Sequence, residues 1–341
     1  MNTSKADKNQ ITKNSDSCTE NSKNNDDILY HYTSLNSTRS ILESKKLRLS
    51  HANYLNDSDE IKLGFTTVKT ILETILEQIE NVSRLESIIL KLSIIFEVNE
   101  DNRFKLVKQI NEININQLIF KTPFDVFIAS FIESSDDLRQ WIQYGDDANG
   151  CSLGFSKNKL KNLIPRVKGQ ELEQLTQVRY LTDDEKNNIK KEIEKKVKEL
   201  DKIKEPKKLD TTPEPEMKEI ELLQFQLLQS LISIIVSIKS KHYENEKEWR
   251  FFIITPMKKI LEETNNILLH FRTSNNTIIP YIVINYCKDN LSILREIKTG
   301  PTNDSMSNRY SLNLLTQNER IDTDNNKIIL TKSKITSYRR R

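Results

Sequence analysis

The stretch that decides the fold is KHYENEKEWRFFIIT, Lys241 to Thr255. It follows a long helical pattern without any turn residue, and it ends in an apolar run typical of a buried strand. Side chains of a strand alternate between its two faces. We therefore expect Glu246, Glu248 and Arg250 to share one face, so that two carboxylates and a guanidinium group converge where a helix passes into a strand.

This convergence of charges has two interpretations. In the first, Glu248 and Arg250 form an ordinary ion pair at the exposed edge of a sheet, which stabilises a protein little. In the second, the two carboxylates line a ligand-binding cleft. The rest of the chain has to decide between them.

Composition excludes several classes of protein. The chain has 341 residues, of which 30% are charged and 36% are hydrophobic. Its net charge is only +3, so its overall electrostatic field does not indicate binding to nucleic acid. Its three cysteines are far apart and its four histidines lack the spacing of metal ligands, which predicts a cytoplasmic protein without a metal site. The most apolar window, Leu222 to Ile238, is interrupted by Gln and Ser and predicts a buried helix rather than a membrane span.

The order of elements predicts an α+β protein. Strands are expected at 28–33, 47–50, 124–132, 177–181, 278–286 and near the end of the chain. Helical insertions are expected at about 61–120 and 157–240, with Pro206, Pro213 and Pro215 marking a linker in the second. We expect a polar disordered tail over 1–27 instead of a signal peptide, a single domain over 28–335, and a basic tail over 336–341.

Six blocks of the sequence together carry a resemblance to a known family. They are LYHYTS (29–34), LRLSHANYLNDSDE (47–60), FIASFIESSDDLRQWIQYG (128–145), GCSLGF (150–155), YENEKEWR (243–250) and IKTGP (297–301). In this order they resemble the bacterial domain-of-unknown-function family 2971. That family implies no activity.

A second resemblance does imply one. The segment HYTSLNSTRSILESKKL (31–47) is similar to the opening of ADP-ribosyltransferase-like folds, including bacterial enzymes that modify DNA bases. This resemblance implies a small split β-sheet core and NAD as substrate. It also implies a catalytic histidine on the first strand, here His31, and a late glutamate, here Glu248. The NAD-binding residues would come from His31, Tyr32, Thr33, Tyr54, Ser130, Trp141 and Arg250, with the middle catalytic element left open among Tyr54, Ser130 and Trp141.

The chemistry of such a site is consistent with these side chains. An ionised Glu248 beside Arg250 would stabilise the oxocarbenium-like transition state of nicotinamide loss, and Glu246 would orient or deprotonate the acceptor. His31 would hold a ribose hydroxyl group, and Tyr32 or Trp141 would stack on the nicotinamide ring. Each has a structural alternative: His31 could satisfy a buried backbone carbonyl, and Trp141 could belong to the core.

Two functions therefore stand side by side. The first is an ADP-ribosyltransferase acting on a nucleic acid or a protein, in phage defence or as a toxin. The second is a non-catalytic sensor or scaffold of a defence system that binds a protein partner through the helical insertions. An exposed apolar stripe on those helices would favour the second. Nucleic-acid processing without NAD is a third option, supported only by the basic tail and the mild positive net charge.

Overall fold

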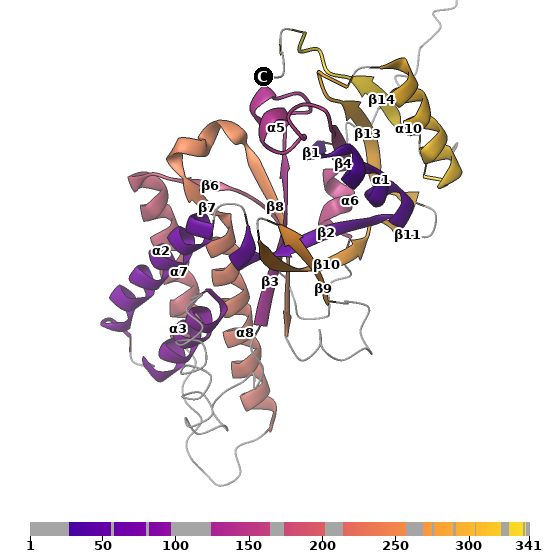
Figure 1. The fold of residues 1–341 in the computed structure, drawn as a ribbon. Helices are drawn as coiled ribbons and strands as arrows, with labels where there is room; N and C mark the ends of the chain where they lie inside the picture. The colour runs from indigo at the N-terminus through magenta and orange to yellow at the C-terminus, as the bar shows by residue number, and fades with distance from the viewer. Residues whose placement is uncertain are drawn as a thin grey trace, which may run out of the picture.

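A ten-stranded mixed sheet forms the centre of the molecule in this computed structural model (Figure 1). Its main path runs β14-β13-β4-β1-β3-β2-β10-β9, with β8 paired to β3 and β5 paired to β8. The strands are β1 (Ile28–Thr33), β2 (Lys46–His51), β3 (Phe124–Ile132), β4 (Cys151–Ser156), β5 (Leu175–Gln177), β8 (Glu248–Pro256), β9 (Leu269–Ser274), β10 (Thr277–Asn285), β13 (Leu294–Thr299) and β14 (Ile329–Lys332). The prediction of an α+β protein is confirmed, but the sheet is larger than the small core that was expected.

The structure describes residues 27–55, 58–79, 82–96, 124–163, 174–201, 214–256, 269–274, 276–288, 291–303, 305–321, 327–336 and 338. Most of the two predicted tails, the end of the first predicted insertion, Pro206 and Pro213 lie outside these residues. Pro215 is described, and it lies in the first turn of a helix rather than in a linker. A missing backbone N–H costs nothing there, because the first N–H groups of a helix have no partner within it.

Strands β3 and β8 lie between the two layers of helices and pack against both. Because side chains alternate along a strand, Ile128 and Phe252 enter one core while Phe127 and Phe251 enter the other. The first core is covered by α2 (Ser58–Leu76), α3 (Val82–Phe96), α7 (Asp183–Asp201) and α8 (Glu214–Ser237). The second is covered by α1 (Leu35–Ser44), α6 (Lys157–Lys161) and α10 (Met306–Asn318). Figure 1 shows these two groups of helices on opposite sides of the sheet.

Side chains that accept hydrogen bonds cap several helices at their N-termini. Ser34 caps α1, where its hydroxyl oxygen accepts a hydrogen bond from the Ser37 N–H at 3.2 Å. Asp137 caps α5 (Leu138–Gln143), and Ser305 caps α10. Among the described residues, no helix is long and apolar enough to cross a membrane.

The passage from helix to strand before β8 differs from the prediction. Helix α8 is followed by the short strand β7 (Ile238–Ser240), which pairs in parallel with β6 (Arg179–Leu181), and then by the 3₁₀ helix η3 (Lys241–Glu246). Lys247 then adopts a left-handed conformation with φ of 47°. Glu246 therefore does not lie on the strand with Glu248 and Arg250, because η3 ends at Glu246 and β8 begins at Glu248.

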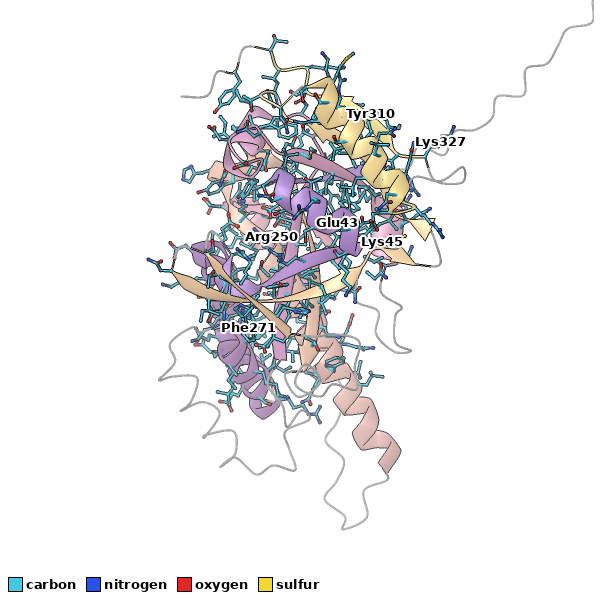
Figure 2. The ribbon with its side chains drawn as sticks, turned by 45° about the vertical axis from the view of Figure 1, so that its right-hand side comes forward. Glu43, Lys45, Arg250, Phe271, Tyr310 and Lys327 are labelled. Carbon is cyan, nitrogen blue, oxygen red and sulfur yellow. The ribbon has the colours of Figure 1, made fainter. Side chains whose placement is uncertain are left out.

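Figure 2 shows where the charged stretch lies in the whole molecule. Arg250 lies in the interior and is 1% exposed, whereas Phe271 on β9 and Tyr310 on α10 lie at the surface. The interpretation of Glu248 and Arg250 as a surface ion pair is therefore wrong.

Candidate functional site

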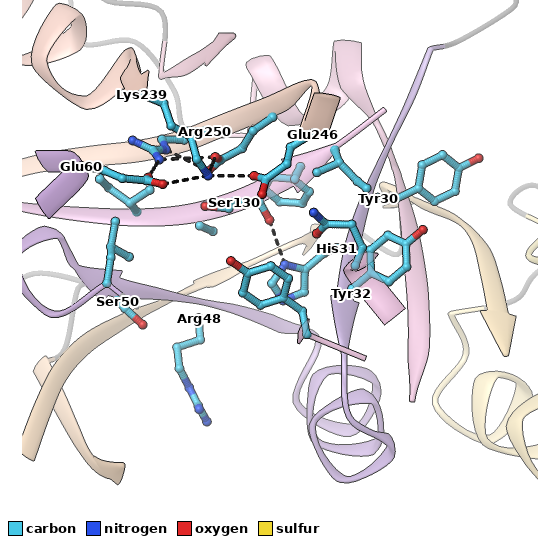
Figure 3. A pocket seen from close by; sticks show the side chains of 18 of the residues that line it. Tyr30, His31, Tyr32, Arg48, Ser50, Glu60, Ser130, Lys239, Glu246 and Arg250 are labelled. Atoms are coloured by element: carbon cyan, nitrogen blue, oxygen red, sulfur yellow. Dashed lines mark hydrogen bonds and ion pairs between the residues drawn. The ribbon is translucent and has the colours of Figure 1, made fainter. Parts of the chain in front are cut away.

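A cavity of about 200 Å³ lies where the central sheet forks (Figure 3). Along one edge of β3, strand β2 pairs with Phe127 and Ile128, whereas β1 pairs only with Ile132. Strands β1 and β2 thus diverge from the same edge and leave the backbone around Ser130 between them. Because a backbone carbonyl without a partner is costly when buried, this gap needs another hydrogen-bond donor.

His31 supplies that donor from β1. Its Nδ1 lies 3.0 Å from the Ser130 carbonyl oxygen, and since a carbonyl can only accept, Nδ1 carries the proton. Burial lowers the pKa of His31 below its ordinary value; the hydrogen bond to Ser130 opposes this shift and the positive charge of Arg48 adds to it. The neutral ring therefore presents Nε2 as an acceptor, and no described residue bonds to it. Nδ1 of His31 thus satisfies a backbone carbonyl, as the structural alternative predicted, while Nε2 remains available to a ligand.

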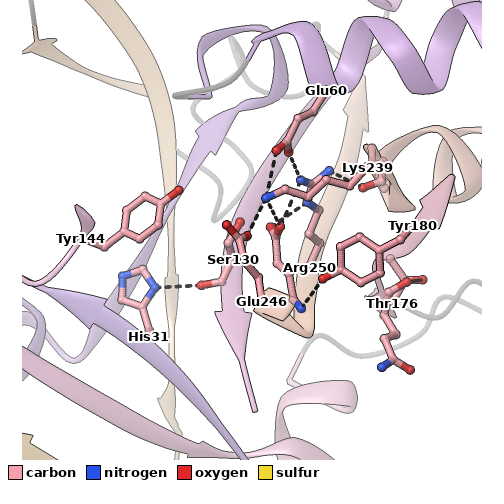
Figure 4. Close-up of polar contacts among 12 residues, drawn as sticks. His31, Glu60, Ser130, Tyr144, Thr176, Tyr180, Lys239, Glu246 and Arg250 are labelled. Carbon is pink, nitrogen blue, oxygen red and sulfur yellow. Dashed lines mark hydrogen bonds and ion pairs between the residues drawn. The ribbon is translucent and has the colours of Figure 1, made fainter. Parts of the chain in front are cut away.

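Lys239 of β7 is the centre of a buried cluster of ion pairs on another wall of the cavity (Figure 4). Its Nζ lies 2.9 Å from Glu60, 2.7 Å from Glu246 and 2.9 Å from Glu248. An ammonium group has three protons, so all three are used. This lysine joins β7, helix α2, the turn η3 and strand β8 at a single point.

Arg250 of β8 closes the same cluster from the other side. Its Nε donates to Glu248 at 2.9 Å, and its terminal nitrogens donate to Glu60 and, at 2.8 Å, to the Val236 carbonyl oxygen. Three carboxylates face two cations, and burial raises the pKa of Glu60 above its ordinary value although Arg250 and Lys239 oppose that shift. Removing one partner from such a buried network typically costs about 3–5 kcal/mol, because it strands a buried charge.

Glu248 is held ionised within this cluster. Burial by itself would raise its pKa, but Arg250 and Lys239 outweigh burial and lower the pKa to about 2. The side chain is 5% exposed, and both of its oxygens already accept hydrogen bonds. Glu248 therefore supplies fixed negative charge, and it has little room to contact a ligand directly.

Glu246 is the more accessible carboxylate of the predicted pair. Its side chain is 12% exposed, and one of its oxygens bonds to Lys239 at 2.7 Å. No described residue donates to its other oxygen. The structure therefore leaves a free acceptor oxygen on Glu246, whereas both oxygens of Glu248 are occupied.

The remaining predicted residues are divided between the cavity and the core. Tyr54 and Ser130 line the cavity with His31 and Arg250. Tyr32 also lines it, but its hydroxyl group bonds to the backbone of Ser134 and Asp137. Thr33 pairs with Cys151 in the sheet and is not part of the cavity lining.

Trp141 belongs to the core and not to the cavity. It is 0% exposed, its indole N–H donates to Asp136 at 2.8 Å, and its ring packs edge-on against Tyr32 at 4.6 Å. A ring enclosed in this way has no face to offer a nicotinamide. The expectation that Trp141 stacks on a ligand is therefore wrong, because the short helix α5 turns it inward.

Several important cavity residues were not singled out from the sequence. Lys239 and Glu60 complete the ion cluster, and Tyr144, Arg48 and Arg272 line the cavity. Lys239 directly follows the apolar run of α8, and a charged side chain that is buried almost always has a partner of opposite charge. Its position in the sequence could therefore have indicated that Lys239 belongs to a cluster of charged residues. In the described part of the chain, no group of His, Cys, Asp and Glu side chains could hold a metal ion.

Comparison with known proteins gives limited information about this site. No curated protein and no solved structure matches the chain, so the ADP-ribosyltransferase-like resemblance gains no support from them. The model of a family described as a protein of unknown function (DUF2971) matches residues 140–251, which is less than half of the chain but includes β4, Lys239 and the first residues of β8.

Proposed function

We propose that the cavity binds NAD and that the protein is an ADP-ribosyltransferase-like enzyme. The observation that supports this proposal is that His31 lines one cavity with Glu246 and Glu248, which are more than 200 residues later in the sequence. The resemblance of the sequence requires such a convergence of an early histidine and a late glutamate. Side chains on opposite faces of the sheet would have argued against it.

The geometry favours a particular division of roles. Transfer breaks the bond between ribose C1′ and the nicotinamide nitrogen, which leaves with the electron pair, while an acceptor forms the new bond to C1′ and loses a proton. The ionised carboxylate of Glu248 would stabilise the positive charge that develops on the ribose. Neutral His31 would accept a hydrogen bond from a ribose hydroxyl group through Nε2, and Glu246 would take the proton of the acceptor.

The size of the cavity limits how NAD would fit. A volume of about 200 Å³ is below the roughly 300–1,000 Å³ of typical ligand pockets. The cavity therefore suits the nicotinamide riboside end of the molecule, with the remainder extending along its open side. The acceptor, a nucleic acid or a protein, would approach Glu246 from that side.

Nicotinamide release from NAD by the purified protein tests the proposal, with and without cell extract as a source of acceptor. We expect Glu246→Gln to reduce release at least about 100-fold, the usual contribution of a general base. The matched control is Glu244→Gln, because Glu244 is an exposed carboxylate on the same 3₁₀ helix and does not line the cavity. Equal release by Glu246→Gln and wild type would contradict the assigned role.

Glu248→Gln is a less informative variant for this test. It removes one carboxylate from a buried cluster and leaves Lys239 and Arg250 partly uncompensated, so lost activity could reflect lost folding. It should be assayed only with its stability measured in parallel.

A non-catalytic sensor is the second candidate, and one observation favours it. The oxygens of Glu248 are occupied by Arg250 and Lys239, as in a purely structural cluster. Binding of NAD without release of nicotinamide would indicate this function. The apolar stripe expected for a partner surface is not seen in the described parts of α2, α3 and α8, where Leu222 is the one large hydrophobic side chain that is exposed.

A further inference from the structure

Two arginines line the cavity on the side away from the ion cluster. Arg48 lies on β2 and Arg272 on β9, and β10 lies between these two strands in the sheet. Tyr281 of β10 pairs with Ser50 on one side and with His270 on the other, so Arg48 and Arg272 project from the same face of the sheet. Figure 3 shows Arg48 and Ser50 across the cavity from Lys239 and Arg250.

Neither arginine has a carboxylate partner among the described residues. Lys239 and Arg250 each form ion pairs shorter than 3 Å, whereas no ion pair joins Arg48 or Arg272 to an acidic side chain in the described ranges. The Nε atom of Arg272 is also buried without a hydrogen-bond partner there. Because buried donors are almost always satisfied in proteins, this atom needs an explanation.

The two guanidinium groups are close enough to repel each other. Burial lowers the pKa of Arg272, and the positive charge of Arg48 lowers it further. Arg48 is held in place by the ring of Tyr281, with its guanidinium carbon 4.5 Å from the ring centre, and His270 stacks on the same ring at 5.3 Å. The fold thus maintains two like charges on a fixed platform beside a cavity, an arrangement that an anion would stabilise.

We propose that Arg48 and Arg272, with the hydroxyl group of Ser50, form a phosphate-binding subsite for a nucleotide in this cavity. Guanidinium groups bind phosphate oxygens through paired hydrogen bonds, and in the described ranges no ion pair occupies the guanidinium group of either arginine. This assignment rests on the proposed function, because the phosphates are those of the NAD molecule whose riboside end would lie near His31. The subsite itself requires no bond to be broken.

A small phosphorylated ligand fits this subsite better than a nucleic-acid backbone does. The cavity has a volume of only about 200 Å³, and the net charge of the chain is +3. Proteins that bind nucleic acid usually carry a basic patch that follows several phosphates along its surface. Here two arginines from one face of the sheet line a single small cavity, which matches a pyrophosphate or a single phosphate group.

Calorimetric titration of the full-length protein with inorganic pyrophosphate tests the subsite directly. We expect wild type to bind, and we expect Arg272→Gln and Arg48→Gln each to raise the dissociation constant about tenfold or more, as the loss of a charge-assisted contact should. Arg39→Gln is the matched control, because Arg39 lies on α1 with a side chain that is 67% exposed and does not line the cavity. It should bind like wild type.

ADP-ribose separates this inference from the proposed reaction, because it carries the pyrophosphate group but has no nicotinamide to lose. Binding of ADP-ribose that depends on Arg272, without nicotinamide release from NAD, would retain the subsite and overturn the enzyme. Failure of wild type to bind pyrophosphate and ADP-ribose would overturn the subsite, as would equal affinity in folded Arg272→Gln. Tighter, Arg272-dependent binding of a single-stranded oligonucleotide would overturn the assignment to a small ligand.

Discussion

His31 contributes both to the fold and to the candidate site. Its Nδ1 closes the gap that the fork leaves at the Ser130 carbonyl, and its Nε2 remains for a ligand. The same side chain should therefore influence both stability and binding, and the two effects can be separated by pH.

The stability of the protein should depend on His31 in mildly acidic solution. Burial lowers the native pKa of His31 below the 6.5 of an ordinary histidine. Below pH 6.5 the unfolded chain then binds more protons than the native one, so the free energy of unfolding falls as the pH decreases. In His31→Gln, whose amide can still donate to Ser130, this contribution of up to about 1.4 kcal/mol per pH unit should disappear.

Urea unfolding at pH 7.5 and 5.5 measures this difference. His242→Gln is the control, because His242 is exposed on η3 and should leave the pH dependence of wild type intact. An identical loss of stability in wild type and His31→Gln between the two pH values would show that His31 titrates normally.

For individual residues, the sequence located the charged side chains of the site better than it assigned their roles. It singled out Glu246, Glu248 and Arg250 because carboxylates and a guanidinium group stood at the start of an apolar strand. It could not show that Lys239 and Glu60 form ion pairs with them, because Glu60 is nearly 200 residues away from Arg250 in the chain and that contact exists only after folding. For the same reason the sequence did not single out Arg48, on a predicted strand, or Arg272, outside the predicted strands.

Individual elements with a strong local pattern were predictable. The apolar run FDVFIASFI predicted β3 at its observed bounds. Strand β9 was missed, because Phe271 and other exposed side chains give it no buried face that the sequence could reveal. The fork was not predictable either, since strand pairing depends on contacts between segments about 100 residues apart.

The contact between helices α2 and α8 leads us to predict a loss of stability where helix propensity alone would predict a gain. Replacing glycine by alanine in a helix normally stabilises it by up to about 1 kcal/mol. At Gly64 of α2, however, a Cβ atom would lie 2.2 Å from the backbone oxygen of Ile235 on α8. We expect Gly64→Ala to lower the free energy of unfolding by about 1–3 kcal/mol, because one of the two helices must move.

Urea unfolding measures that change, and Thr66→Ala provides the control. Thr66 is exposed on the same helix, so alanine there should be neutral or slightly stabilising. An increase in stability for Gly64→Ala would mean that the two helices pack less closely than the structure shows.

At the scale of the whole molecule, strands β3 and β8 contribute alternate side chains to both hydrophobic cores. Phe127 and Phe251 lie in one core, and Ile128 and Phe252 lie in the other. The N-terminal strand β1 and the C-terminal strand β14 belong to this same sheet. The helical insertions therefore cannot detach from the sheet without exposing one side of its central strands, which favours the single domain predicted over 28–335.

The two tryptophans of the chain can test this unity, since they lie outside the core that α2, α3, α7 and α8 cover. Trp141 packs against Tyr32, and Trp249 lies on β8 with Lys157 Nζ 3.9 Å above its ring. In Trp141→Phe and Trp249→Phe, the fluorescence of the remaining tryptophan should change at the same urea concentration as the helical circular dichroism signal of that variant. Earlier loss of the helical signal in both variants would show that the helical layer unfolds separately, and that the sheet does not need it.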